Sequence, residues 1–233
     1  MAVIHSGTTL TPNKLELATA WLPAQPWYAG PAGSEPVLAK AGGFRLDDPQ
    51  GEVGIEFMVV TDTAGDTPVT YQLPLTYRGA PLDGADAALV GTTEHGVLGK
   101  RWVYDGAHDP VLTGQLAALL LGRAEPQAQH ISDTPDPTVT ATLDPAAARL
   151  LEPLQVTETA QRPDATDLLL ASAAAPAVLR IVRRLQAAGE GEGGEVQGGG
   201  EGGAAVAGSV TAPWADADGS TLRGAFALLL PAS

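Results

Sequence analysis

The sequence predicts an α+β fold, built mainly from antiparallel, curved β-sheet with a few flanking helices. Three observations support this prediction. Apolar residues occupy every second position from Val53 to Val59, which is typical of a strand with one buried face. Short runs rich in β-forming residues recur along the chain between Gly, Pro and Asp residues. Helical signals, in contrast, occur mainly in the first half.

The first half contains two predicted helices and three predicted strands. Thr11 or Asn13 can cap the first helix, which Pro23 ends. Pro110 in a first turn and Gly122 after a last turn bracket the second helix. The strands are predicted at 53–59, 67–77 and 101–104, and an Asp105-Gly106 turn follows the last of them.

The second half is predicted to consist of strands. They are expected at 154–158, 166–172, 177–184, 205–211 and 222–230, with Asp218-Gly219 turning the last pair. The Pro-rich polar stretch at 126–135 indicates a linker between a first part, 1–125, and a second part, 136–233. One curved sheet shared by both parts is an arrangement that this pattern allows.

A low-complexity segment at 189–208 interrupts the second part. Ten of its twenty residues are Gly and four are Glu, so burial cannot offset the entropy of ordering it. We expect a flexible loop. Its opening, Gly189 to Gly194, satisfies G-x-G-x-x-G but leads into more glycine instead of a helix that could hold a phosphate. A phosphate-binding loop is therefore not predicted.

Charge and composition exclude several classes of partner. The 233 residues include 13 Lys and Arg against 27 Asp and Glu, for a formal charge of −14. Nucleic acid and anionic membranes need a basic face, so neither is expected as a partner. The absence of Cys excludes a disulfide framework and a cysteine nucleophile and fits a reducing compartment. With no apparent signal peptide or membrane span, the sequence predicts a cytoplasmic protein.

No catalytic, cofactor-binding or metal-ligating residue is assigned from the pattern. The four histidines, His5, His95, His108 and His130, share no i, i+4 spacing. Neither a Walker motif nor G-x-S-x-G occurs. No cofactor is therefore expected.

Three ordered stretches indicate a known family. Residues 21–30 read Trp-Leu-Pro-Ala-Gln-Pro-Trp-Tyr-Ala-Gly, residues 71–78 read Tyr-Gln-Leu-Pro-Leu-Thr-Tyr-Arg, and residues 98–106 read Leu-Gly-Lys-Arg-Trp-Val-Tyr-Asp-Gly. They resemble the WLPxQxWYxG, YQLPLxYR and LGxRWVYDG elements of the maltokinase N-terminal cap. Maltokinases make maltose 1-phosphate from ATP in α-glucan metabolism, and the resemblance implies a cap over about residues 8–122.

The second part resembles the beginning of the maltokinase kinase N-lobe, with departures. Residues 153–172 correspond to the hairpin that covers ATP, and residues 178–184 to the strand whose Lys contacts the phosphates. Arg180 stands at that Lys position, and the Gly/Glu segment replaces the helix that follows. Residues 225–231 resemble the hinge strand, and neither HRD nor DFG occurs. The resemblance thus implies a cap joined to a degenerate, truncated N-lobe without a C-lobe.

Five residues are candidate contacts for a ligand or partner. Trp27 and Tyr28 follow Pro26 in a predicted turn, where exposed aromatic rings could stack on a sugar or anchor a protein. Arg78, Lys100 and Arg101 are cations on an acidic chain and could meet an anionic group. The alternative is that the aromatic residues fill the core and the cations pair with nearby carboxylates.

The resemblance and the missing transfer machinery together predict a non-catalytic accessory or regulatory protein. It would be linked to α-glucan, maltose, glycogen and trehalose metabolism and would act through a protein partner. One alternative is a carbohydrate-binding module that holds maltodextrin through Trp27 and Tyr28. Others are part of a sugar kinase completed in trans, and a stabilising or oligomerising subunit.

Overall fold

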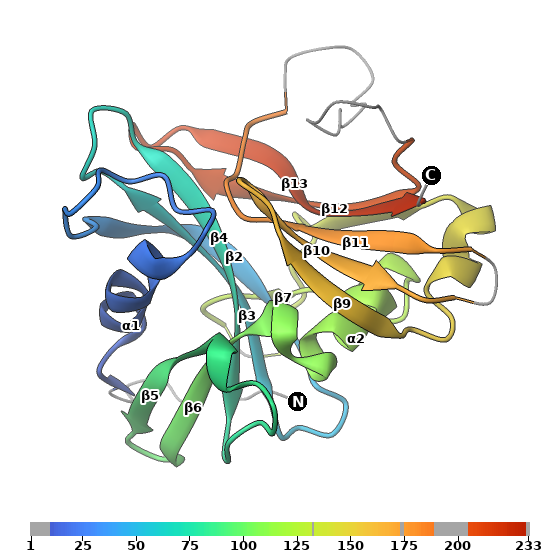
Figure 1. Ribbon diagram of the computed structural model, residues 1–233, viewed down its shortest axis with the longest axis horizontal. Coiled ribbons are helices and arrows are strands. Elements are labelled where there is room, and N and C mark those ends of the chain that lie inside the picture. The colour runs from blue at the N-terminus through green and yellow to red at the C-terminus, as the bar shows by residue number, and fades with distance from the viewer. Residues whose placement is uncertain (1–9, 132, 173–174, 189–204, 232–233) are drawn as a thin grey trace.

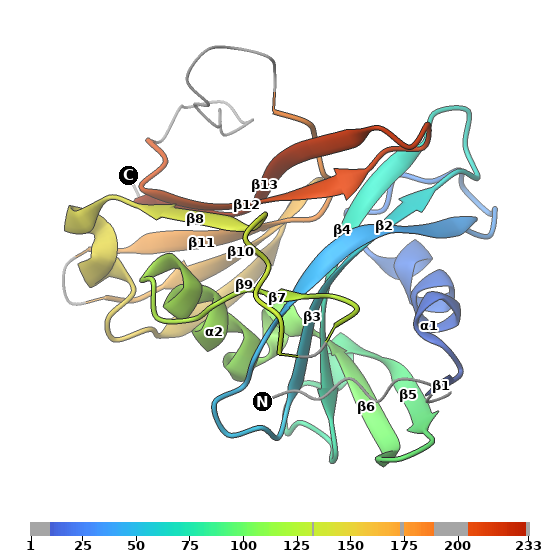
Figure 2. The same ribbon diagram turned by 180° about the vertical axis from the view of Figure 1, so that it is seen from behind.

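The computed structural model describes residues 10–131, 133–172, 175–188 and 205–231. Within these residues the chain forms two antiparallel sheets that meet at an angle, with one helix between them and one on the outside (Figures 1 and 2). The α+β class predicted from the sequence, mainly curved antiparallel sheet, is confirmed. No helix in the described part of the chain is long and apolar enough to span a membrane.

The first sheet has seven strands in the order β1-β5-β6-β4-β3-β2-β7. They are β1 (Leu10–Thr11), β2 (Leu38–Leu46), β3 (Gly54–Asp62), β4 (Val69–Arg78), β5 (Leu89–His95), β6 (Gly99–Asp105) and β7 (Gln127–Ala128). The second sheet has six strands in the order β8-β12-β13-β11-β10-β9. They are β8 (Thr140–Leu143), β9 (Val156–Gln161), β10 (Ala165–Leu170), β11 (Ala177–Val182), β12 (Gly208–Ala215) and β13 (Thr221–Pro231).

Helix α1 (Lys14–Trp21) begins at the cap that the sequence predicts. The Asn13 side chain accepts hydrogen bonds from the backbone N–H groups of Leu15 and Glu16, and Glu16 accepts one from the Asn13 N–H at 2.7 Å. This reciprocal capping box satisfies N–H groups that have no partner within the helix. A short 3₁₀ turn, Leu22–Ala24, follows the helix and contains Pro23.

Helix α2 (Pro110–Leu120) lies in the angle between the two sheets (Figure 2). Asp109 caps its first turn, Pro110 occupies the first helical position, and Gly122 follows at φ +69°. The apolar face of α2 enters a core to which both sheets contribute. In that core the Phe44 and Phe57 rings stack with their centroids 4.5 Å apart. A second apolar cluster lies between α1 and the opposite face of the first sheet.

The two sheets are joined where β4 meets the segment after β11. Tyr71 and Arg184 form an antiparallel bridge, and the Leu185 N–H donates to the Thr70 carbonyl at 2.9 Å. The Gln72 side chain donates to the carbonyls of Val182 at 2.7 Å and Phe226 at 3.1 Å. The described residues thus form two sheets linked at this junction, and not the single curved sheet that the strand pattern allows.

Several elements differ from the sequence-based expectation. The predictions name no strand at β2, β5 or β8, whose sequences contain glycines or short polar runs instead of clear alternation. In β2 a bulge follows Lys40, and Gly43 adopts φ +130°. A Cβ at Gly43 would stand 2.1 Å from the Phe57 carbonyl oxygen, so the approach of β3 requires glycine there.

The boundaries 1–125, 126–135 and 136–233 stay predictions. Within the predicted linker, β7 pairs with β2, and Gln127 is buried. Most of the predicted Gly/Glu loop, residues 189–204, lies outside the described residues, whereas its last residue, Gly208, begins β12.

Candidate functional site

The position that the resemblance assigns to the nucleotide lysine is occupied by an ion pair. Arg180 on β11 stands directly opposite Asp167 on β10 in the strand register, so both side chains lie on the same face of the sheet. The Arg180 Nε donates to Asp167 Oδ1 at 2.6 Å and its Nη2 to Oδ2 at 2.9 Å. This two-pronged geometry is the strong form of an Arg–carboxylate contact.

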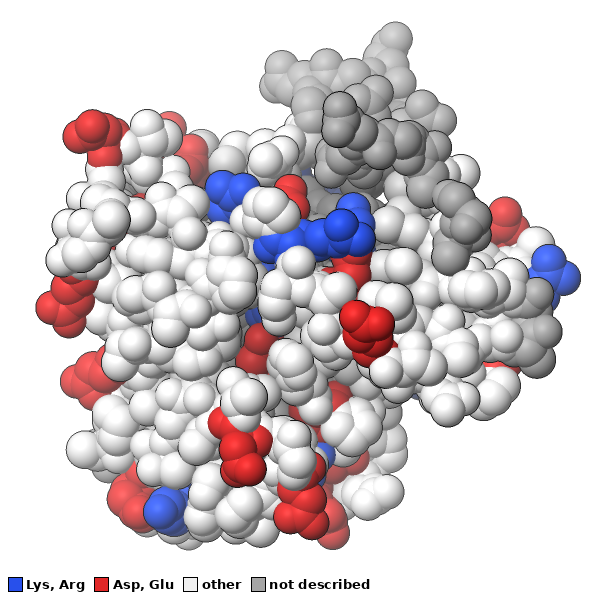
Figure 3. All heavy atoms as spheres, in the orientation of Figure 1, with Lys and Arg blue, Asp and Glu red and all other residues white. Residues whose placement is uncertain are grey.

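A second arginine completes this cluster. Arg162, which follows β9, donates from Nε to Asp167 Oδ2 at 2.9 Å. The Asp167 side chain is 1% exposed, while Arg180 is 22% and Arg162 is 55% exposed. Burial opposes ionisation, but hydrogen bonds from Arg180 and Arg162 outweigh it and lower the pKa of the Asp167 carboxyl. Figure 3 shows Lys and Arg side chains gathered over this part of the molecule, with carboxylates among them.

The expected exposure of Trp27 is wrong, because only 1% of this residue is accessible. After α1 the chain turns inward and places the indole against Trp21 and Tyr71, with ring centroids 5.7 and 5.9 Å away. The Arg183 guanidinium lies 4.9 Å from the Trp27 ring centroid. Trp27 is therefore a core residue and presents no open ring face to a sugar.

Arg183 is fully buried at the junction of the sheets, and the sequence analysis assigned it no role. Its Nη2 donates to both oxygens of Asp105, at 2.8 and 2.7 Å, and its Nε donates to Thr166 Oγ1 at 2.8 Å. Because Asp105 ends β6 in the first sheet and Thr166 lies on β10 in the second, this arginine ties the sheets together. The only sequence signal for this contact is its acidic partner, Asp105, which lies in the stretch that resembles LGxRWVYDG.

Tyr28 is partly buried and its hydroxyl is engaged. It donates to Asp62 Oδ2 at 2.9 Å, and Asp62 also accepts the Val37 and Ala64 N–H groups. Burial, together with the hydrogen bond and negative charge of Asp62, raises the pKa of Tyr28 to about 12. The phenol thus fixes the turn after α1 against the end of β3.

Arg78 is also paired within the chain. Its Nε and Nη2 donate to the two oxygens of Asp109, each at 2.6 Å, and the Asp109 side chain is fully buried. Burial opposes ionisation of Asp109, but the hydrogen bond from Arg78 outweighs it and lowers the pKa of the carboxyl. Since Asp109 also caps α2, the pair positions that helix.

Lys100 and Arg101 lie in the hairpin formed by β5 and β6, and the structure separates their roles. The Arg101 Nη2 donates to the Leu98 carbonyl at 3.1 Å and so supports the hairpin tip. Lys100 is exposed, and its Nζ lies 5.0 Å from the centroid of the partly buried Trp102 ring, within the range of a cation–π contact. Of the five candidate contacts, Lys100 is the exposed one.

A further polar cluster surrounds the buried Glu56 on β3. Its carboxylate accepts hydrogen bonds from Lys14 Nζ at 2.5 Å, the Tyr77 hydroxyl at 2.8 Å and Gln129 Nε2 at 2.9 Å. Burial opposes ionisation, but the charge and hydrogen bond of Lys14 outweigh it and lower the pKa of Glu56. A carboxylate held in this way joins the start of α1 to the sheet and is a poor proton acceptor.

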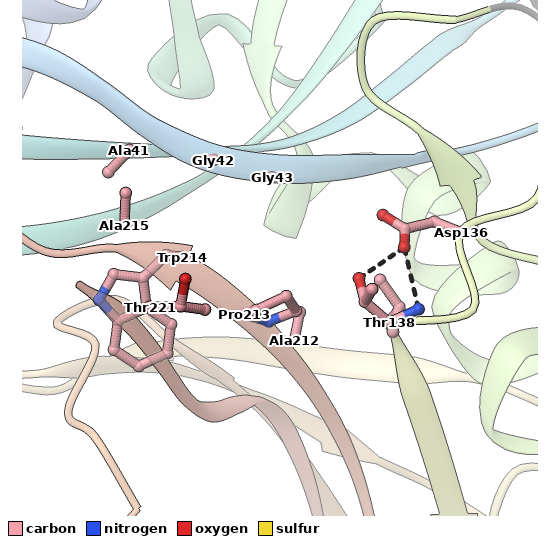
Figure 4. Close-up of a pocket in the computed structure, with 11 residues that line it drawn as sticks. Ala41, Gly42, Gly43, Asp136, Thr138, Ala212, Pro213, Trp214, Ala215 and Thr221 are labelled. Carbon is pink, nitrogen blue, oxygen red and sulfur yellow. Dashed lines mark hydrogen bonds between the residues drawn. The ribbon is translucent and has the colours of Figure 1, made fainter. Parts of the chain in front are cut away.

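A shallow pocket of about 270 Å³ lies between β2 and β12 (Figure 4). Its wall consists largely of glycine, alanine and proline, and its carboxylate, Asp136, accepts hydrogen bonds from the backbone N–H and hydroxyl of Thr138. Trp214 at the pocket is only 3% exposed. Among the described residues, no three His, Asp or Glu side chains are grouped so that they could hold a metal ion.

The chain is a two-sheet α+β protein in which the carboxylates of Glu56, Asp105, Asp109 and Asp167 are each paired with a Lys or Arg of the same chain. Residues 21–109 match the family model of the maltokinase N-terminal cap domain. The cap-like family predicted from the three motifs is therefore confirmed for this region, which runs from the end of α1 through β6 to Asp109. No curated protein matches the chain significantly. The likeness of the second part to a kinase N-lobe stays a prediction.

Proposed function

We propose that this chain is a non-catalytic accessory or regulatory protein that acts by binding a protein partner. Its recognised region is the maltokinase cap, which is not the catalytic part of a maltokinase. The observation that supports the proposal most strongly is the closed pair of Arg180 and Asp167. If the second part derives from a kinase N-lobe, its phosphate-binding position is filled by the chain itself.

The energetics of this pair disfavour nucleotide binding. A phosphate could engage the Nε and Nη2 edge of Arg180 only by displacing Asp167, whose carboxylate is almost completely buried. Loss of a fully buried partner costs about 3 kcal/mol or more, and the cost here is smaller, because Arg180 is 22% exposed and Arg162 would still pair with Asp167. A nucleotide bound with a millimolar dissociation constant gains only about 4 kcal/mol. Displacement would therefore reduce the affinity that a phosphate contact could provide.

The metabolic context comes from the family alone. We place the partner among enzymes of α-glucan, maltose, glycogen or trehalose metabolism because the cap belongs to maltokinases, and we expect the cytoplasm as the compartment. The burial of Trp27 removes one of the two aromatic rings on which the maltodextrin alternative depended, and Tyr28 is partly buried. A kinase completed in trans would still need Arg180 to reach a nucleotide.

Calorimetric titration of the purified chain with ATP–Mg²⁺ and, separately, with maltotriose tests the proposal. A maltokinase with a complete C-lobe is the positive control, and phosphoryl transfer to maltose is measured in parallel. We expect no saturable heat from either ligand and no transfer. Heat with ATP–Mg²⁺ together with maltose phosphorylation would overturn the non-catalytic assignment, and heat with maltotriose alone would replace it by carbohydrate binding.

A further inference from the structure

The hairpin of β5 and β6 presents an apolar surface with balanced charge. We define the hairpin surface by six residues: Leu89, Glu94, Val97, Leu98, Lys100 and Trp102. Val97 and Leu98 at the hairpin tip are 62% and 47% exposed, and Leu89, at the other end of β5, is 36% exposed. Concentrated exposed aliphatic side chains mark association surfaces more often than scattered ones do.

Hydrogen bonds within the chain support the aliphatic tip. The N–H groups of Val97 and Leu98 both donate to His95 Nδ1, at 3.2 and 3.1 Å. Arg101 donates to the Leu98 carbonyl at 3.1 Å, and Gly99 supplies the φ of +68° that returns the chain into β6. A tip fixed in this way loses little conformational entropy when it is buried.

The charges on the hairpin surface are suited to a second copy of the same surface. Glu94 and Lys100 are partners in the β5–β6 register, and neither forms an ion pair within the described residues. A two-fold axis through the hairpin would bring Lys100 of one copy to Glu94 of the other. Two copies of the chain, each with a formal charge of −14, repel each other over most of their surfaces. They can approach most easily at a surface that is locally neutral and apolar.

The hairpin lies away from the junction of the two sheets. In both views β5 and β6 lie at the end of the first sheet that is far from the second sheet (Figures 1 and 2). We infer that the hairpin surface is the interface of a symmetric dimer, in which Val97 and Leu98 pack against the partner hairpin and Lys100 pairs with Glu94 across the axis.

Sedimentation velocity over a wide concentration range tests the dimer. We expect the wild type to dimerise and the double variant Val97→Glu, Leu98→Glu to raise the dimer dissociation constant by at least about tenfold. Val37→Glu and Ile131→Glu are matched controls, since these residues are 58% and 59% exposed elsewhere, and both should dimerise like the wild type. Circular dichroism verifies that each variant is folded.

A charge exchange distinguishes this interface from nonspecific association. Glu94→Lys and Lys100→Glu should each weaken the dimer, because each places like charges across the axis, and the double exchange should restore it. A monomeric wild type at all concentrations, or equal loss of dimer in the control variants, would overturn the inference. Nucleotide binding is a separate property of Arg180, so the two proposals can fail independently.

Discussion

Asp105→Asn would expose how strongly the two sheets depend on their buried ion pair. Asparagine keeps the shape and can still accept the Ala107 N–H, but it removes the charge that faces Arg183. The Arg183 guanidinium is fully buried and donates to both Asp105 oxygens, so the variant leaves a cation without its counter-charge. Such a loss costs about 3–5 kcal/mol.

That loss is a large part of the free energy of unfolding of a typical domain. The free energy of unfolding of a globular domain is about 5–15 kcal/mol. At this chain length, each kcal/mol of lost stability lowers Tm by about 2–4 °C. We therefore expect the variant to unfold at a clearly lower urea concentration and at least about 6 °C lower in temperature. Urea titration followed by circular dichroism gives the free energy of unfolding directly.

The exposed pair of Arg123 and Glu152 provides the control. Their side chains are 59% and 45% exposed, and Arg123→Gln should change stability by no more than about 1 kcal/mol. In the double variant Asp105→Leu, Arg183→Met both charges are absent, and stability should recover relative to Asp105→Asn. If Asp105→Asn costs no more than Arg123→Gln, the reasoning that this pair locks the sheets together is refuted.

Three further predictions concern pH, backbone and core. The pKa of Asp167 is lowered in the folded state, so its ion pair contributes stability above the unfolded value of 3.8 and loses it as pH falls further. Urea unfolding at neutral and acidic pH should show a loss of stability in acid, and this loss should be smaller in Asp167→Asn, in which Asp109 and Glu56 still contribute to it. Gly43→Ala should lower the free energy of unfolding by more than about 2 kcal/mol, because the new Cβ overlaps the Phe57 carbonyl. Gly33→Ala is the control: this glycine has φ +78° but open space around it, so the loss of stability in the same assay should be smaller. Trp27→Ala should destabilise by about 3–5 kcal/mol in urea unfolding, and unchanged stability would contradict its place in the core.

Local sequence signals predicted most of the elements. Asn13 with Glu16, and Pro110 with Gly122, bracket the two helices because capping and chain termination depend on neighbouring residues. Strands with strong alternation were also predicted near their observed positions. β2 was missed because its stability depends on pairing with β3 around a glycine bulge, which no local pattern reports.

The candidate site was less predictable, because its contacts join distant parts of the chain. Arg180 could be singled out by resemblance, but its pairing with Asp167 depends on the strand register. The burial of Arg183 depends on Asp105, a residue of the other sheet. Trp27 was expected in an exposed turn, and only the folded chain shows that this turn packs inward. Long-range packing, not composition, decides whether such side chains are available to a ligand.

In the proposed function, Asp167 closes the Arg180 position to phosphate. Calorimetric titration with ATP–Mg²⁺ of the wild type and of Asp167→Asn tests it most directly, with Glu152→Gln as a control that removes an exposed carboxylate. We predict no saturable heat for the wild type or the control, and measurable binding for Asp167→Asn, in which both arginines lose their counter-charge. Binding of ATP–Mg²⁺ to the wild type with the same affinity as to Asp167→Asn would contradict the account.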